Sequence, residues 1–257
     1  MLPVIHIGPL SIQARGLILL LAFWFAAEAT ERGAKRLGLR SDHVYNFAFW
    51  AGLAGLLGAR LGYVLEYWSV YQNNLGAVFE LNLNTFSPLA GVFVASVVAY
   101  ACAQRKGMAN RRWLDALTPG FSVFACGLAL ADWASGEGYG APALLPWSIE
   151  LWGELRHPTQ VYQLLAVIAI GLVVLRSSRP FEGARFGIFV TFYAASRLLI
   201  EAFHGDSVTF AGVRVVQVWS LLAILAALIL LRRWASSSSG DRLAPSPDLD
   251  HFVGQGS

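Results

Sequence analysis

The chain has 257 residues, of which 56% are apolar and only 14% are charged, and its mean hydropathy is +0.54. Soluble domains have a charged fraction of about a quarter, and disordered chains have the opposite balance of apolar and charged residues. The composition therefore excludes both classes and indicates a membrane-embedded protein, in which the positions of the charges matter more than the net charge of +3.

Seven apolar runs are bounded by charged or turn residues. A helix needs about 20 mostly apolar residues to cross a bilayer, and six more runs follow the first, so we interpret the first as a retained helix rather than a cleaved signal peptide. The expected transmembrane helices are residues 10–29, 43–66, 87–104, 114–133, 159–176, 185–203 and 213–233. We predict an all-α fold with one transmembrane domain, residues 1–234, and a disordered polar cytoplasmic tail, residues 235–257.

Lysine and arginine are concentrated in alternate loops. The loops after the first, third and fifth helices and the segment after the seventh contain fourteen of the nineteen basic residues. Short cytoplasmic loops have the positive excess in membrane proteins. The sequence therefore predicts seven spans with the N-terminus outside and the C-terminus in the cytoplasm.

The remaining basic residues are all arginines, and all fall in or just above the external half of the predicted helices. They are Arg15, Arg60, Arg156, Arg197 and Arg214. A charge at membrane depth is costly and usually faces a partner or a wet cavity, and the planar guanidinium binds phosphate with two parallel hydrogen bonds. This level of the membrane is therefore a candidate phosphate site. Alternatively, the arginines extend to the outer headgroups or pair with carboxylates to hold helices together.

Two segments add polar groups at the same level. In the sixth helix, Arg197, Glu201 and His204 recur at helical spacing and share one face. The sequence HPTQVYQ, residues 157–163, opens the fifth helix, where Pro158 suits the first turn. Cys102 and Cys126 lie in apolar runs and are interpreted as packing residues, so we expect no metal site.

The order of several motifs resembles the prolipoprotein diacylglyceryl transferase family, from about residue 7 to residue 234. The motifs are GARLGYV at residues 58–64, Gly136-Glu137 with Gly140, HPTQVYQ, RLLIEAFH at residues 197–204, and Gln217. The resemblance implies transfer of diacylglyceryl from phosphatidylglycerol to the lipobox cysteine thiol of a secreted precursor, with release of glycerol phosphate. It also implies a multi-pass protein of the bacterial inner membrane whose partners are phosphatidylglycerol, lipobox precursors and membrane lipid, with no cofactor and no nucleic acid.

The resemblance also implies positions for the site residues. The lipid-headgroup cavity would be lined by Arg60, His157, Gln160, Tyr162, Arg197 and Glu201, with Glu137 in the external segment after the fourth helix. We assign catalytic roles to Arg197, Glu201, Asp132 and His157, and substrate-binding roles to Arg15, Arg60, Glu137, Gln160, Tyr162 and His204.

The sequence departs from the family pattern at several functional positions. A His-Gly-Gly that opens the third helix in the family reads Ser87, Pro88 and Leu89; an Arg reads Ala129, two Asn read Asp132 and Ser135, and a Tyr reads Arg15. Arg15 can supply the missing cation, and Asp132 or His157 a base for the thiol.

Three hypotheses therefore stand side by side. The first is a divergent transferase, and the second is a paralogue that binds phospholipid or lipoprotein precursors without transfer. The third is a small transporter or structural membrane protein whose arginines link helices.

Overall fold

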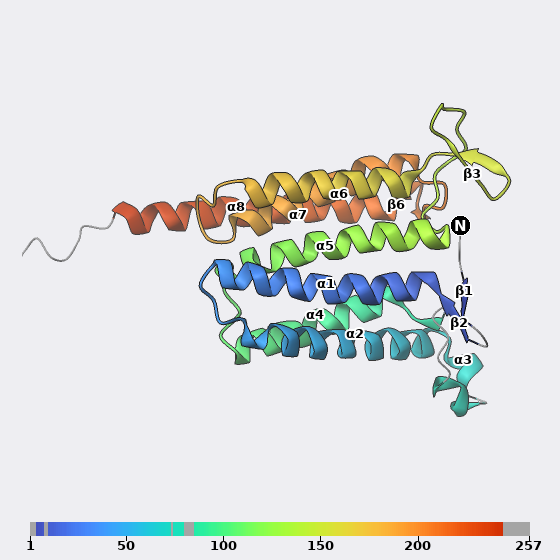
Figure 1. Ribbon diagram of the computed structural model, residues 1–257, viewed down its shortest axis with the longest axis horizontal. Coiled ribbons are helices and arrows are strands. Elements are labelled where there is room, and N and C mark those ends of the chain that lie inside the picture. The colour runs from blue at the N-terminus through green and yellow to red at the C-terminus, as the bar shows by residue number, and fades with distance from the viewer. Residues whose placement is uncertain (1–3, 8–9, 73, 80–84, 244–257) are drawn as a thin grey trace, which may run out of the picture.

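The computed structural model describes residues 4–7, 10–72, 74–79 and 85–243. Within these ranges, seven long helices run side by side along the long axis of the molecule (Figure 1). They are α1 (Ala14–Arg36), α2 (Val44–Glu66), α4 (Pro88–Arg105), α5 (Arg111–Ser135), α6 (Thr159–Arg176), α7 (Ala184–Ile200) and α8 (Val215–Leu243). Each corresponds to one of the helices expected from the apolar runs, so the helical fold is confirmed.

Six stretches of the described chain are long and apolar enough to cross a membrane, and they contain α2, α4, α5, α6, α7 and α8. The first helix, α1, has 23 residues and is as long as α2. Arg15, Glu28 and Glu31 interrupt its apolar run, and for this reason it does not satisfy the same criterion of composition.

Several helix bounds differ from those expected. The first helix begins at Ala14 rather than residue 10, because Leu10–Gln13 forms strand β2 and pairs with β1 (Val4–Ile7). The last helix continues to Leu243, so the expected start of the polar tail at residue 235 falls inside α8. Residues 244–257 of that expected tail lie outside the described residues.

Short strands and short helices gather at one end of the helices, which we call the hairpin end (Figure 1). Hairpin β1–β2 precedes α1, β3 (Ile149–Leu151) pairs with β4 (Glu154–Arg156), and β5 (Thr209–Phe210) pairs with β6 (Val213–Arg214). The same end holds α3 (Trp68–Tyr71) and the 3-10 helices η2 (Leu75–Phe79) and η4 (Glu201–Phe203). A third 3-10 helix, η1 (Ser41–His43), lies at the opposite end.

That opposite end, the basic end, carries the loops at residues 37–43, 106–110 and 177–183 (Figure 1). These loops and the adjoining helix ends contain the lysines and arginines of the charge-rich loops, including Arg36, Lys106 and Arg179. The two ends of the molecule therefore differ in charge as the alternation of loops predicts.

Small residues set the closest helix contacts. A Cβ on Gly33 of α1 would lie 2.5 Å from the carbonyl oxygen of Ala116 on α5, and a Cβ on Gly91 of α4 would lie 2.8 Å from the Cβ of Ala59 on α2. Membrane helices pack through such small residues because lipid provides no hydrophobic drive for their association. Within their apolar windows, 50% of the residues of α5 but only 6% of those of α4 are buried. The central helix of the molecule is therefore α5, while α4 packs against α2 and leaves its remaining surface open.

Candidate active site at the hairpin end

An ionic cluster joins the start of α1 to the end of α5. Arg15 lies in the first turn of α1, and its Nη2 is 3.3 Å from Oδ1 of Asp132. Its Nη1 pairs with the carboxylate of Glu137, just beyond α5. The side chains of Arg15 and Asp132 are each about one third exposed, so the cluster is half-buried and open to small polar molecules.

A second charged group forms where α7 ends. The Arg197 guanidinium is 3.8 Å from the carboxylate of Glu201, one turn later. Glu201 and His204 are both buried. Arg214, on β6, donates to the backbone carbonyls of Glu201 and His204. A cation suits this position because the last carbonyls of a helix carry partial negative charge.

The segment that follows α5 brings these two groups together. Gly136 ends α5 with φ of 77°, and Gly138 has φ of 60°, a conformation that side chains rarely adopt. Thr159 donates to the Gly138 carbonyl at 2.6 Å, and the Gln160 amide donates to the Glu137 carbonyl at 2.8 Å. The first turn of α6 therefore fixes the backbone of residues 137 and 138, which lies close to both Asp132 and His204.

The same segment is paired with the chain after α7. Ala141 N–H donates to the Phe203 carbonyl at 2.7 Å, and Gly205 N–H donates to the Tyr139 carbonyl at 2.9 Å. Arg156 of β4 makes a third contact, since its guanidinium carbon lies 4.9 Å from the centroid of the Tyr139 ring. The same side chain pairs with Glu154 in its own hairpin. The backbone of residues 137–141 is therefore fixed by contacts with α6, with the chain after α7 and with Arg156.

His157 and Tyr162 belong to an aromatic group beside this segment. Nδ1 of His157 lies 3.3 Å from the Tyr162 hydroxyl, and the His157 ring is 5.1 Å from that of Phe203. Trp147 donates its indole N–H to the same hydroxyl at 2.7 Å. Tyr162 is therefore tied to the loop before β3 as well as to His157.

Arg60 has a different set of partners. Its guanidinium donates to the carbonyls of Ala77, Val78 and Thr85 at 2.6 to 2.9 Å, and also to the Thr85 hydroxyl. The rings of Tyr71 and Phe86 lie within 5.9 Å of it. The structure thus places Arg60 at the hairpin end, where it binds the chain between α2 and α4 instead of joining the Arg15 cluster.

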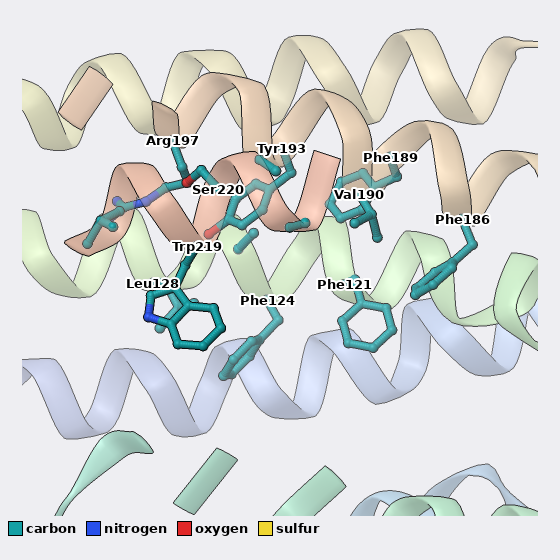
Figure 2. A pocket seen from close by; sticks show the side chains of 14 residues that line it. Phe121, Phe124, Leu128, Phe186, Phe189, Val190, Tyr193, Arg197, Trp219 and Ser220 are labelled. Carbon is teal, nitrogen blue, oxygen red and sulfur yellow. The ribbon is translucent and has the colours of Figure 1, made fainter. Parts of the chain in front are cut away.

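An apolar cavity of about 430 Å³ lies between α5, α7 and α8. Figure 2 shows Phe124, Phe189 and Trp219 among its walls, with Phe186 at one end and Arg197 at the other. Phe186 and Arg197 are ~16 Å apart along α7, since a helix rises ~1.5 Å per residue. Tyr193 and Ser220 also line it. The cavity therefore leads from a hydrocarbon-like wall to a guanidinium beside a polar cluster.

Most of the predicted site residues lie together, on or beside the segment 136–141. The structure gathers Arg15, Asp132, Glu137, Gln160, Arg197, Glu201 and His204 around it, with His157 and Tyr162 adjoining. Tyr193 and Trp219, which line the cavity, are not among the site residues predicted from the sequence. Tyr193 precedes Arg197 by one helical turn, so its place on the same helix face could have been predicted from the sequence. Nothing in the sequence distinguishes Trp219 from any interfacial tryptophan.

Comparison with known proteins identifies the family of this chain. The family model for prolipoprotein diacylglyceryl transferase matches residues 3–233. A phosphatidylglycerol–prolipoprotein diacylglyceryl transferase of Finegoldia magna is 28% identical over 203 residues, which cover 77% of this chain and 81% of that protein. A protein of the same name from Streptococcus suis is 28% identical over 247 residues, covering 91% of this chain and 92% of the relative. Since the match to the family model spans nearly all of the helices, the chain belongs to the prolipoprotein diacylglyceryl transferase family.

Proposed function

We propose that this chain transfers the diacylglyceryl group of phosphatidylglycerol to the thiol of a lipobox cysteine in a secreted precursor. The observation that carries this proposal is the apolar cavity ending at Arg197, beside the buried Glu201. Its length of ~16 Å is about half of a ~30 Å hydrocarbon core. An acyl chain lying in it would therefore bring the lipid phosphate to Arg197.

The polar cluster supplies contacts for the headgroup. Arg197 is the cation nearest the cavity, and Arg15 provides a second one across Asp132. Guanidinium groups bind phosphate through paired hydrogen bonds. Gln160 is 3% exposed, and its Oε1 has no hydrogen-bond partner among the described residues. A hydroxyl of the glycerol headgroup would satisfy this buried oxygen.

The proposed topology places the site on the external side of a bacterial inner membrane. The basic end would face the cytoplasm, because basic loops remain there, and the hairpin end would face the precursor after its export. In this arrangement α1 is the first of seven spans, with Arg15 turned toward Asp132 rather than toward lipid. Residues 1–234 would form the single membrane domain.

A direct assay tests the proposal. The purified full chain in phosphatidylglycerol vesicles is incubated with a lipobox peptide, and the peptide mass is followed. We expect a gain of one diacylglyceryl group, no gain with a serine in place of the cysteine, and roughly a 100-fold slower gain with Arg197→Ala, since removal of one charge-stabilising donor costs about that much. An unmodified peptide, under conditions in which the Streptococcus suis relative modifies it, would refute the transfer.

A second candidate is binding without transfer. Ala129 is 3% exposed and stands one turn before Asp132 on α5, so α5 offers no functional group at that position. Such a protein would bind phosphatidylglycerol, lose affinity on Arg197→Ala and leave the peptide unmodified. Detection of thioether product in the assay above eliminates this candidate.

A further inference from the structure

The proposed transfer needs a base for the thiol, and His204 has the geometry of one. Its ring is buried, with a side chain that is 9% exposed. Nδ1 lies 3.2 Å from the backbone carbonyl oxygen of Ile200. A carbonyl only accepts hydrogen bonds, so Nδ1 carries the proton in the neutral ring and Nε2 is left with the free lone pair.

Nε2 of His204 and the Asp132 carboxylate both lie close to Gly138. If Gly138 had a Cβ, this atom would lie 3.8 Å from Nε2 of His204 and 3.8 Å from Oδ2 of Asp132, the two nearest heavy atoms. Backbone pairing between Gly140 and His204 holds the two segments in register. The histidine nitrogen and the carboxylate therefore lie beside the same glycine, which has no side chain to cover them.

Two carboxylates lie close to this ring. The Glu201 carboxylate is 3.7 Å from Nδ1, and Asp132 interacts electrostatically with the ring. The charged groups that interact with His204 are Asp132, Glu201 and Arg214, and Arg15, Arg197 and Asp206 in turn interact with Asp132. The Glu201 carboxylate thus helps to hold the ring in its orientation.

We propose that His204, through Nε2, is the general base that deprotonates the acceptor thiol. This inference rests on the proposed function and names a residue for its first step. The thiol proton passes to Nε2 while the sulfur lone pair forms a bond to the terminal glycerol carbon of the lipid. The carbon–oxygen bond to phosphate breaks, and its electron pair leaves on glycerol phosphate beside Arg197. The proton then passes from the imidazolium to the released phosphate or to water.

Two substitutions distinguish a role of Nε2 as the base from a structural role of Nδ1 as a hydrogen-bond donor. In His204→Asn, the side-chain amide can still donate to the Ile200 carbonyl, as Nδ1 does, but no base remains at the position of Nε2. His204→Gln places an amide near the position of Nε2, again without a base. His43→Asn, in η1 at the basic end, is the matched control and retains the activity of the parent.

The experiment uses the purified full chain in phosphatidylglycerol vesicles with two peptides that differ only in cysteine or selenocysteine. A selenol is ionised at neutral pH and needs no base. We expect both His204 variants to lose about 100-fold in kcat/KM with the cysteine peptide, the usual scale of general-base catalysis. With the selenocysteine peptide, the loss in kcat/KM of the His204 variants should fall below about fivefold. The acidic limb of the profile of kcat/KM against pH, which reports the base, should disappear in these variants.

Other outcomes overturn the proposal. Equal losses with both peptides would assign His204 a structural role, and so would full activity of His204→Asn together with loss in His204→Gln. Unchanged activity in both variants would exclude His204 from the reaction. A parent protein that modifies neither peptide would contradict the transfer itself, which distinguishes failure of the proposed function from failure of this inference.

Discussion

Arg15 connects two acidic groups that belong to different parts of the chain. It pairs with Asp132 inside α5 and with Glu137 beyond it. These two ion pairs hold α1 against α5 and the segment that follows it. The Arg15 side chain is 35% exposed, so neither carboxylate removes it fully from water.

A double-mutant cycle measures the structural part. We expect Arg15→Gln and Asp132→Asn each to lower the midpoint of thermal unfolding in detergent. The double variant should be destabilised by less than the sum of the two single losses. The coupling should be about 1 kcal/mol, as for partly exposed ion pairs. Strict additivity would contradict a pair. The exposed Arg32–Glu28 pair on the same helix provides a matched cycle with a smaller coupling.

At the scale of elements, the α2–α4 contact depends on missing side chains. A Cβ on Gly58 would lie 2.5 Å from the Cβ of Val94, and one on Gly91 would lie 2.9 Å from the Gly55 carbonyl oxygen. The two helices therefore approach so closely that neither position has room for a methyl group. Arg60 lies at the outer end of this pair and binds the connecting chain.

Gly91→Leu tests this contact. The larger side chain should separate α4 from α2 and cost about 1–3 kcal/mol, as overpacking does in other cores. The midpoint of thermal unfolding reports the loss. Val97→Leu adds bulk on the exposed side of the same helix and should leave the midpoint unchanged. If both variants melt like the parent, the helices do not pack at the distance described.

At the scale of the whole molecule, the proposed site and the proposed topology depend on each other. The ionic cluster, the Arg197 end of the cavity and the three hairpins share one end of the helices, while the basic loops share the other. If the basic end faces the cytoplasm, the cluster lies at the level of the outer leaflet, where an exported precursor presents its cysteine. A reversed orientation would separate the site from that substrate.

Cysteine labelling in intact cells determines the orientation. After Cys102 and Cys126 are replaced by alanine, a single cysteine is introduced at Glu154 in β4 or at Ser178 in the loop between α6 and α7; both positions are exposed. A membrane-impermeant maleimide should label Glu154→Cys in intact cells and Ser178→Cys only after permeabilisation. The reverse pattern would refute the proposed topology.

The sequence by itself determined the class of fold and predicted most of the residues of the candidate site. Apolar runs of helix length predicted the seven long helices, because lipid requires an apolar surface all along a span. Two ends differ clearly, since α1 ends at Arg36 rather than residue 29 and α8 at Leu243 rather than residue 233. Charges inside those runs identified Arg15, Arg197 and Glu201, since an ionisable group at that depth needs a partner. The order of motifs gave the family, which the comparison confirmed.

The tertiary structure alone decided how those residues combine. Arg60 and Arg15 look alike in sequence, yet one binds its own neighbouring chain and the other pairs with α5. Asp115, near the start of α5, accepts hydrogen bonds from the Gly183 and Phe186 backbone and so caps α7. Partners of this kind are distant along the chain, and periodicity contains no record of which helix faces which. The tautomer of His204 likewise depends on which carbonyl its Nδ1 reaches, a fact that only the folded backbone fixes.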